Sequence, residues 1–136
     1  NHTLFESSAA SDVYKRQAYY RETGLFPIMH AVAIKASLAA TNSSLPAAVF
    51  RLYSEAKNSA YQNLASTTVL RTSLPWAAEE YEDTRALMGH DYWRYGIEAN
   101  SKELEAMVRY AHGQRLVGKR IDYLDMFHPT TLELAG

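Results

Sequence analysis

The chain has 136 residues and a mass of 15.3 kDa, which is enough for one ordinary domain or for one part of a larger protein. Hydrophobic residues make up 47% and charged residues 21%, a composition typical of a globular chain that forms a core. The formal net charge of -1 argues against nucleic acid as a partner, and the absence of cysteine excludes disulfide scaffolds, thiol nucleophiles and cysteine-ligated metal sites. No apolar run reaches the ~20 residues that a membrane helix needs, so no membrane partner is expected.

Residues 1–17 have neither helical nor alternating periodicity, and we predict that they are a disordered or artefactual segment outside the domain. They lack the basic start and the apolar stretch of a signal peptide. Residues 12–17, DVYKRQ, resemble the in-frame translation of the mosaic end of a common sequencing transposon. On that interpretation the domain covers residues 18–136 and its upstream part is missing. The alternative is a natural flexible N-terminal arm.

Residues 26–34 carry apolar side chains on both alternating faces, a pattern that predicts a strand covered on both sides in an α/β protein. No comparable strand follows, so its hydrogen-bonding partners would have to come from elsewhere. His30 lies in the middle of this strand, where a buried imidazole needs a hydrogen-bond partner. It is therefore either a core histidine with its hydrogen bonds satisfied or a side chain that faces a ligand.

Three helices are predicted after this strand. Ser44 as N-cap and Pro46 in the first turn begin the first helix. Its expected inward stripe consists of Val49, Leu52, Tyr53, Ala56, Ala60 and Leu64. Ser73 and Pro75 begin the second helix in the same way, and Gly89 ends it. The inward residues predicted for the second helix are Trp76, Ala77, Tyr81, Thr84, Leu87 and Met88.

The third helix is expected from Asn100 to Gly113, with Glu103 completing a capping box. It should bury Leu104, Met107, Val108 and Ala111. Residues 114–136 are predicted to be loop, with a short helical turn at 122–127. Between the second and third helices, residues 89–100 are rich in aromatic side chains and contain two glycines. Such a loop usually packs on itself or covers a neighbouring element, and less often lines a site.

Few catalytic patterns are present. The five histidines have no metal-ligand spacing, so no metal site is expected, and there is no nucleophile elbow, P-loop or dinucleotide fingerprint. The acidic cluster Glu79, Glu80, Glu82 and Asp83 is typical of a solvated helix face. Arg21 either binds an acidic substrate or pairs with Glu22.

The run YYRETGLFPIMH at 19–30 resembles a segment of the 4,5-dihydroxyphthalate decarboxylase family. Further similar stretches follow in order: EAK at 55–57, LPW at 74–76, MG at 88–89, Trp93, YGIE at 95–98, Asn100, Phe127 and TLE at 131–133. The resemblance covers residues 18 to about 133 and is fairly specific because the stretches keep their order. Arg94 departs from the family pattern, which leaves the exact substrate open.

The resemblance implies an α/β fold, namely the C-terminal part of a two-lobed, type II periplasmic-binding-protein-like structure. This part would be mostly helical with one main buried strand. It also implies a cytoplasmic carbon–carbon lyase that converts 4,5-dihydroxyphthalate to protocatechuate and carbon dioxide without an obligatory cofactor. The ligand would be a small aromatic dicarboxylate, and the oligomeric state stays open.

Within that resemblance, His30 is the candidate catalytic residue, as proton donor or as a hydrogen bond to the substrate. Arg21, Tyr19 and Tyr20 are candidates for substrate binding through the carboxylates. The chain by itself is expected to be inactive because most of the site would lie elsewhere. Two alternatives remain: a solute-binding protein of a transporter for sulfonates, nitrate or pyrimidine precursors, and a self-contained small helical domain.

Overall fold

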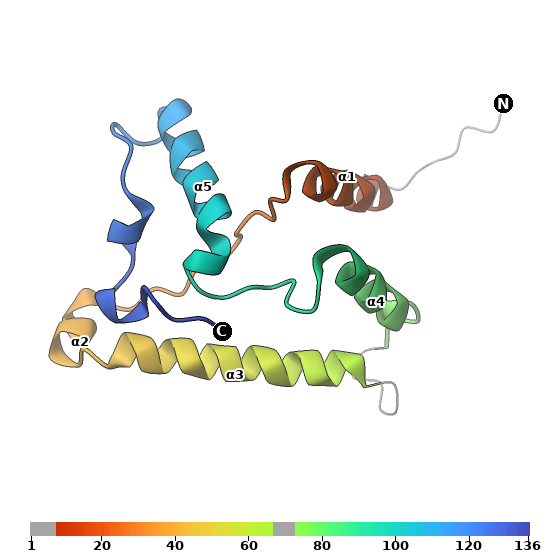
Figure 1. Ribbon diagram of the computed structural model, residues 1–136, viewed down its shortest axis with the longest axis horizontal. Coiled ribbons are helices and arrows are strands. Elements are labelled where there is room, and N and C mark those ends of the chain that lie inside the picture. Colours follow the sequence, from red (N-terminus) through yellow and green to blue (C-terminus); the bar gives the residue numbers. More distant parts are fainter. Residues whose placement is uncertain (1–7, 67–72) are drawn as a thin grey trace.

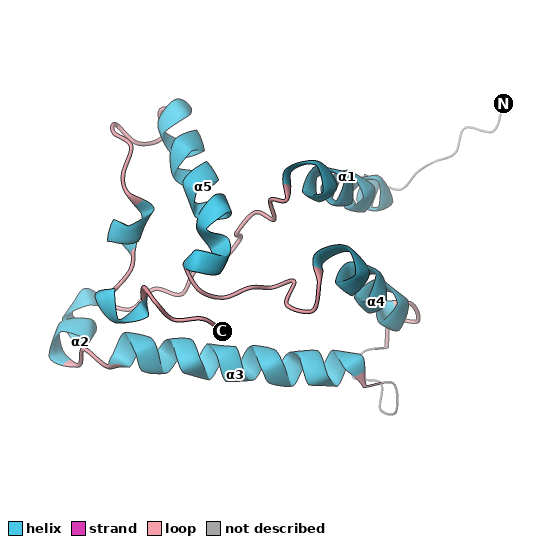
Figure 2. Ribbon diagram, in the orientation of Figure 1, coloured by secondary structure: helices cyan, strands magenta, loops and turns pink. Residues whose placement is uncertain are grey.

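The computed structural model describes residues 8–66 and 73–136. These residues form helices and loops, and none of them is in a strand (Figures 1 and 2). The helices are α1 (Ser8–Thr23), α2 (Ala36–Thr41), α3 (Leu45–Ala65), α4 (Ala77–Met88) and α5 (Ser101–Gly113), with the 3-10 turns η1 (Glu98–Asn100), η2 (Tyr123–Met126) and η3 (Pro129–Thr131). None of the described helices combines the length and the apolar character needed to cross a bilayer.

Helix α3 is the longest element and the base of the structure. It packs against α2, α4 and the C-terminal turn η3, while α5 packs against η1 and η2. Figure 1 shows α2 at the N-terminal end of α3, α4 over its C-terminal half, and the last residues of the chain returning along α3. The loop from 89 to 100 therefore connects α4, which packs on α3, to α5, which packs on η1 and η2.

The predicted strand at 26–34 is wrong. Residues 24–35 join α1 to α2 as an extended loop, and Ile28, Met29 and Val32 are 42%, 57% and 57% exposed. Among the described residues, the one hydrogen bond from 26–34 to another element is donated by the Phe26 N–H. A strand is stabilised by backbone partners, and no described segment supplies them. The expected α/β fold with a main buried strand is therefore not the fold of the described chain, which is helical.

Helix α3 begins after Ser44, as predicted, and carries Pro46 in its first turn. The Ser44 hydroxyl donates to Asn42 Oδ1 and makes no cap hydrogen bond. The expected inward stripe, however, is largely exposed: Leu52 is 64%, Tyr53 46% and Leu64 41% exposed. The covered residues lie about a quarter-turn round the helix. They include Pro46, Ala47, Phe50, Ser54, Lys57 and Tyr61, while Val49 is the half-buried member of the expected stripe.

The other two predicted helices are present with shifted starts or different caps. Helix α4 begins at Ala77, with an exposed Trp76 rather than Ser73 at its N-cap position, and ends at Gly89 as predicted. Helix α5 covers the predicted residues, but no capping box forms, because the Glu103 carboxylate turns to the Phe26 N–H and to Arg94. The predicted helical turn near the C-terminus is η2.

Two helices were not predicted from the sequence. Helix α2 is a short helix of six residues. Helix α1 occupies most of residues 1–17, the segment for which the sequence shows no periodicity. Residues 1–7 of that segment lie outside the described residues. The transposon origin of residues 12–17 stays a prediction.

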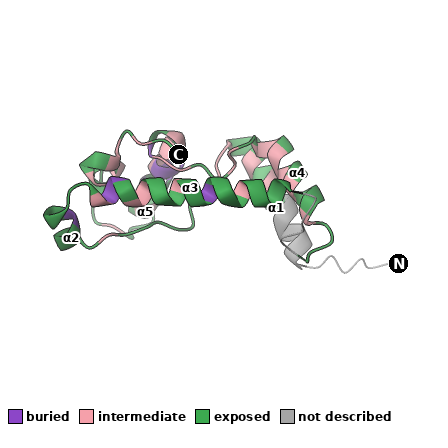
Figure 3. Cartoon of the chain, turned by 90° about the horizontal axis from the view of Figure 1, so that it is seen from below, coloured by how far each residue is buried: buried purple, intermediate pink, exposed green. Residues whose placement is uncertain are grey.

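The described apolar core is small. Its buried residues are Ala39, Ala47, Ile97, Leu104, Ala106 and Val108. Three of these six are alanines, and two charged residues, Lys57 and Glu103, are buried with them. Figure 3 shows isolated buried positions on helices that are otherwise half-buried or exposed. Polar anchors therefore contribute much of the specificity of this arrangement.

Gly96 should be intolerant of substitution. Its φ is +102°, and a Cβ on it would lie 2.6 Å from the Leu134 carbonyl oxygen. Gly96→Ala is expected to lower the free energy of unfolding by about 2 kcal/mol, because both the backbone conformation and the contact become strained. The measurement is urea unfolding followed by circular dichroism. Gly118→Ala is the control, since its Cβ would meet nothing within 4 Å; equal effects of the two changes would contradict the assignment.

Candidate functional site

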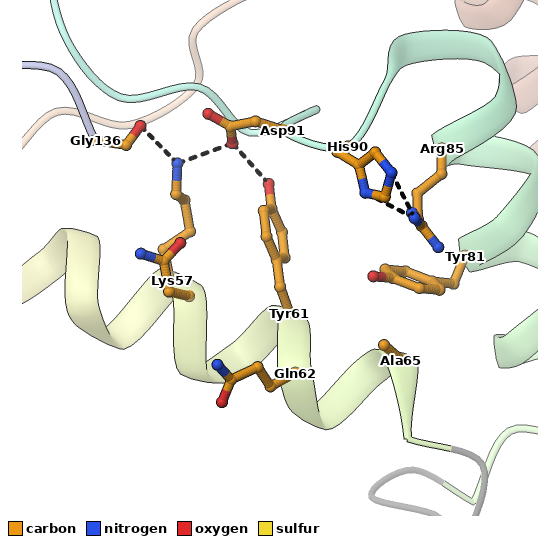
Figure 4. A pocket seen from close by; sticks show the side chains of 10 residues that line it. Lys57, Tyr61, Gln62, Ala65, Tyr81, Arg85, His90, Asp91 and Gly136 are labelled. Atoms are coloured by element: carbon orange, nitrogen blue, oxygen red, sulfur yellow. Dashed lines mark hydrogen bonds and ion pairs between the residues drawn. The ribbon is translucent and has the colours of Figure 1, made fainter.

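The covered face of α3 places a lysine and a tyrosine under the loop that follows α4. Lys57 and Tyr61 are one helical turn apart and point to the same side (Figure 4). The Lys57 side chain is 5% exposed, and its Nζ donates to Asp91 Oδ1 at 2.8 Å and to the Gly136 carbonyl oxygen at 2.9 Å. The Lys57 ammonium thus joins three parts of the chain: α3, the loop and the C-terminal stretch.

Asp91 is the acceptor that holds this cluster together. Its Oδ1 also accepts from the Tyr61 hydroxyl at 3.2 Å, and that hydroxyl accepts from the Trp93 N–H at 2.9 Å. The Lys57 Nζ lies 4.8 Å from the centre of the Tyr95 ring, a cation–π contact. The prediction that the aromatic loop covers a neighbouring element is confirmed, and the element is α3.

Two tyrosines of this region titrate above the ordinary phenol range. Burial raises the pKa of Tyr61 above its usual value of 10.0, and the negative charge of Asp91 adds to the effect. Burial also raises the pKa of Tyr92, whose ring lies 4.9 Å from that of Tyr61. Both phenols are therefore neutral near pH 7, and Tyr61 acts as a hydrogen-bond donor rather than as an acid.

A pocket of about 470 Å³ opens beside this cluster, between α3, α4 and the start of the loop. Arg85 and His90 line its far side in Figure 4. The Arg85 Nη1 pairs with Glu82, and its Nη2 lies 2.7 Å from the His90 Nδ1, which accepts because a guanidinium only donates. The acidic residues of α4 are exposed, as predicted for a solvated face.

A second pocket of about 340 Å³ lies between the end of α1, the extended segment and α5. Its walls are mainly apolar and aromatic: Tyr19, Leu25, Pro27, Ile28, Ala106, Met107, Tyr110, Ala111 and Leu116. Glu103 also lines it, and its side chain is 3% exposed. The Glu103 Oε1 accepts from the Phe26 N–H at 3.4 Å and from Arg94 Nη2 at 3.2 Å.

The structure does not bring the sequence-predicted site residues together in one pocket. Tyr19, Tyr20 and Arg21 are in the last turns of α1, and Tyr19 lines the second pocket. His30 is exposed in the extended segment and lines neither pocket. Its assignment as proton donor stays a prediction, but its expected burial in a strand is wrong.

The cations that line the first pocket, Lys57 and Arg85, both have carboxylate partners: Asp91 in the pocket and the exposed Glu82 outside it. This arrangement first of all fixes the loop. No group of three or more metal-ligating side chains was found in the described residues. Sequence reasoning missed Lys57 and Asp91, although a lysine in step with Phe50 and Tyr61 on one helix face is a usable signal.

The chain is distantly related to a known decarboxylase. It is 31% identical over 132 residues to a 4,5-dihydroxyphthalate decarboxylase from Comamonas testosteroni, a match that covers 96% of this chain and 38% of the relative. The chain thus spans well under half the length of that relative. The match also extends into residues 1–17, since it leaves only 4% of the chain uncovered. No family model matches the chain.

Replacing Lys57 should cost more than replacing an exposed lysine. Lys57→Met leaves the Asp91 carboxylate and the Gly136 carbonyl oxygen without their shared donor, and we expect the free energy of unfolding to fall by about 2 kcal/mol. Urea unfolding measures this, with Lys102→Met on exposed α5 surface as control. A Lys57→Met, Asp91→Asn double variant should lose less than the sum of the single changes. Additive losses would show that the pair is not coupled.

Proposed function

We propose that this chain is part of a non-oxidative aromatic-acid decarboxylase that converts 4,5-dihydroxyphthalate to protocatechuate and carbon dioxide. The observation that carries the proposal is the similarity to a 4,5-dihydroxyphthalate decarboxylase over 96% of the chain. The enzyme would be a cytoplasmic carbon–carbon lyase, and its ligand a small aromatic dicarboxylate.

The proposed reaction needs a proton and a place for negative charge. The bond between the ring carbon and one carboxylate breaks, carbon dioxide leaves, and the electron pair of that bond stays with the ring carbon, which takes up a proton. The hydroxyl para to the departing carboxylate stabilises the charge by tautomerising. The protein would therefore supply a proton donor and groups that hold the two carboxylates.

The segment 19–30 offers residues of the required kinds. Arg21 is exposed in the last turn of α1 and can reach an anionic ligand, and Tyr19 borders the second pocket beside it. His30 is exposed on the extended loop, so its imidazole is accessible to a substrate. We propose His30 as proton donor and Arg21, Tyr19 and Tyr20 as contacts for the carboxylates.

The chain would act as one part of a longer enzyme. It matches 38% of the relative's length, and the exposed apolar residues of α3, Leu52, Tyr53 and Leu64, offer a surface on which another part can pack. The site would then be completed by groups outside these residues. The 136-residue chain alone should not decarboxylate the substrate.

The direct test is an activity assay on the product of the complete gene that encodes this chain. Incubation with 4,5-dihydroxyphthalate should yield protocatechuate and carbon dioxide in equal amounts, while the 136-residue chain should yield neither. Chromatography of the aromatic acid and trapping of the gas measure both products. If the product binds an anion tightly but converts no substrate, the result would contradict the proposed enzyme and favour a solute-binding protein.

His30→Ala in the complete protein should lower kcat by about 100-fold, because loss of a general acid removes proton transfer to the ring carbon. His112→Ala, on the exposed last turn of α5, is the matched control and should leave kcat unchanged. Steady-state kinetics with 4,5-dihydroxyphthalate give both values. Unchanged kcat and KM in His30→Ala would remove His30 from the site.

A further inference from the structure

The extended segment between α1 and α2 is fixed to the rest of the described chain by one buried carboxylate. Glu103 belongs to α5, yet its Oε1 accepts the Phe26 N–H across 77 positions of sequence. Among the described residues, no other hydrogen bond links 26–34 to another element. The Phe26 ring also meets Trp93 edge-to-face at 5.6 Å.

The anchor is placed so that it controls the candidate site residues. Phe26 lies between Arg21 and His30, five positions after the first and four before the second. A chain held at Phe26 keeps both residues within five positions of an attachment to α5, whereas a chain released there has no other hydrogen bond to α5. The remaining segment, up to α2, is mostly exposed.

The Glu103 carboxylate is buried and paired. Its side chain is 3% exposed, and its Oε1 accepts from Arg94 Nη2 at 3.2 Å as well as from the Phe26 N–H. A charge-assisted hydrogen bond in a dry environment is stronger than one at the surface. Glu105, two residues along, is about half exposed and pairs with Arg120, which makes it a matched control.

We infer that Glu103 is a positioning residue: by holding the Phe26 N–H it places His30 and Arg21 for the substrate. This inference rests on the proposed function, because it names those two residues as parts of the reaction site. It predicts an effect of Glu103 on turnover although His30 and Glu103 are not in contact.

The anchor itself can be tested in the 136-residue chain without any assay of activity. Amide hydrogen exchange should show Phe26 protected compared with Met29, whose N–H has no acceptor among the described residues. Glu103→Ala should abolish the protection, and Glu103→Gln, whose amide oxygen still accepts, should keep it. Equal exchange of Phe26 and Met29 in the unchanged chain would overturn the inference, whatever the protein's activity.

The effect on the reaction is tested in the complete protein. Glu103→Ala should lower kcat by about tenfold or more and raise KM for 4,5-dihydroxyphthalate, because a small misplacement of reacting groups slows a reaction strongly. Glu103→Gln should restore most of both values, and Glu105→Ala should match the unchanged protein. A purely structural Glu103 would change the unfolding temperature and leave kcat and KM as they were, which would overturn the inference.

A double change separates positioning from general damage. Because Glu103 would act on turnover through His30, adding Glu103→Ala to His30→Ala should produce little further loss of kcat. If the double variant lowers kcat by the product of the two single effects, the inference is overturned.

If Glu103→Ala does not fold, Glu103→Gln is the deciding variant. Protection of the Phe26 amide together with near-normal kcat supports the anchor, and loss of either overturns it. Intact Phe26 protection in a protein without decarboxylase activity would instead refute the proposed function alone.

Discussion

The buried ammonium of Lys57 is the constraint on which the centre of this structure depends. A lysine out of water needs oxygen acceptors around it, and here one comes from Asp91 in the loop after α4 and one from Gly136. These two hydrogen bonds hold the loop against α3. There the Trp93 N–H donates to the Tyr61 hydroxyl. The first pocket is therefore a consequence of how a buried charge is satisfied.

Glu103 imposes the same kind of constraint with the opposite charge. The Glu103 Oε1 needs hydrogen-bond donors. It accepts from the Phe26 N–H, which is 77 positions away in the sequence, and from Arg94 in the loop before α5. The described apolar core has six residues, half of them alanine, so these polar anchors contribute strongly to which loops lie on which helices. Large apolar residues of α3, Leu52, Tyr53 and Leu64, meanwhile remain exposed, so no described element covers this second apolar face.

Helices α3, α4 and α5 were predictable because their signals are local. These signals are prolines in first turns, glycines at helix ends and apolar residues at helical spacing. The strand at 26–34 was wrong because alternation describes side chains, whereas a strand also needs backbone partners, which the described chain lacks. The α3 stripe was misassigned because an apolar face does not reveal which element covers it. The position of Glu103 suits a capping box, but its carboxylate instead accepts a hydrogen bond from the Phe26 N–H, which is distant in the sequence.

The candidate site was harder to predict than the helices because its groups act over long sequence separations. The resemblance to decarboxylases drew attention to residues 19–30, but the pattern contains no sign that Phe26 is the point of attachment or that Glu103 is its partner. An exposed segment held at one internal point can present the side chains on both sides of that point to a ligand. That geometry accounts for a motif whose polar residues are exposed while its central N–H is bound by a buried carboxylate.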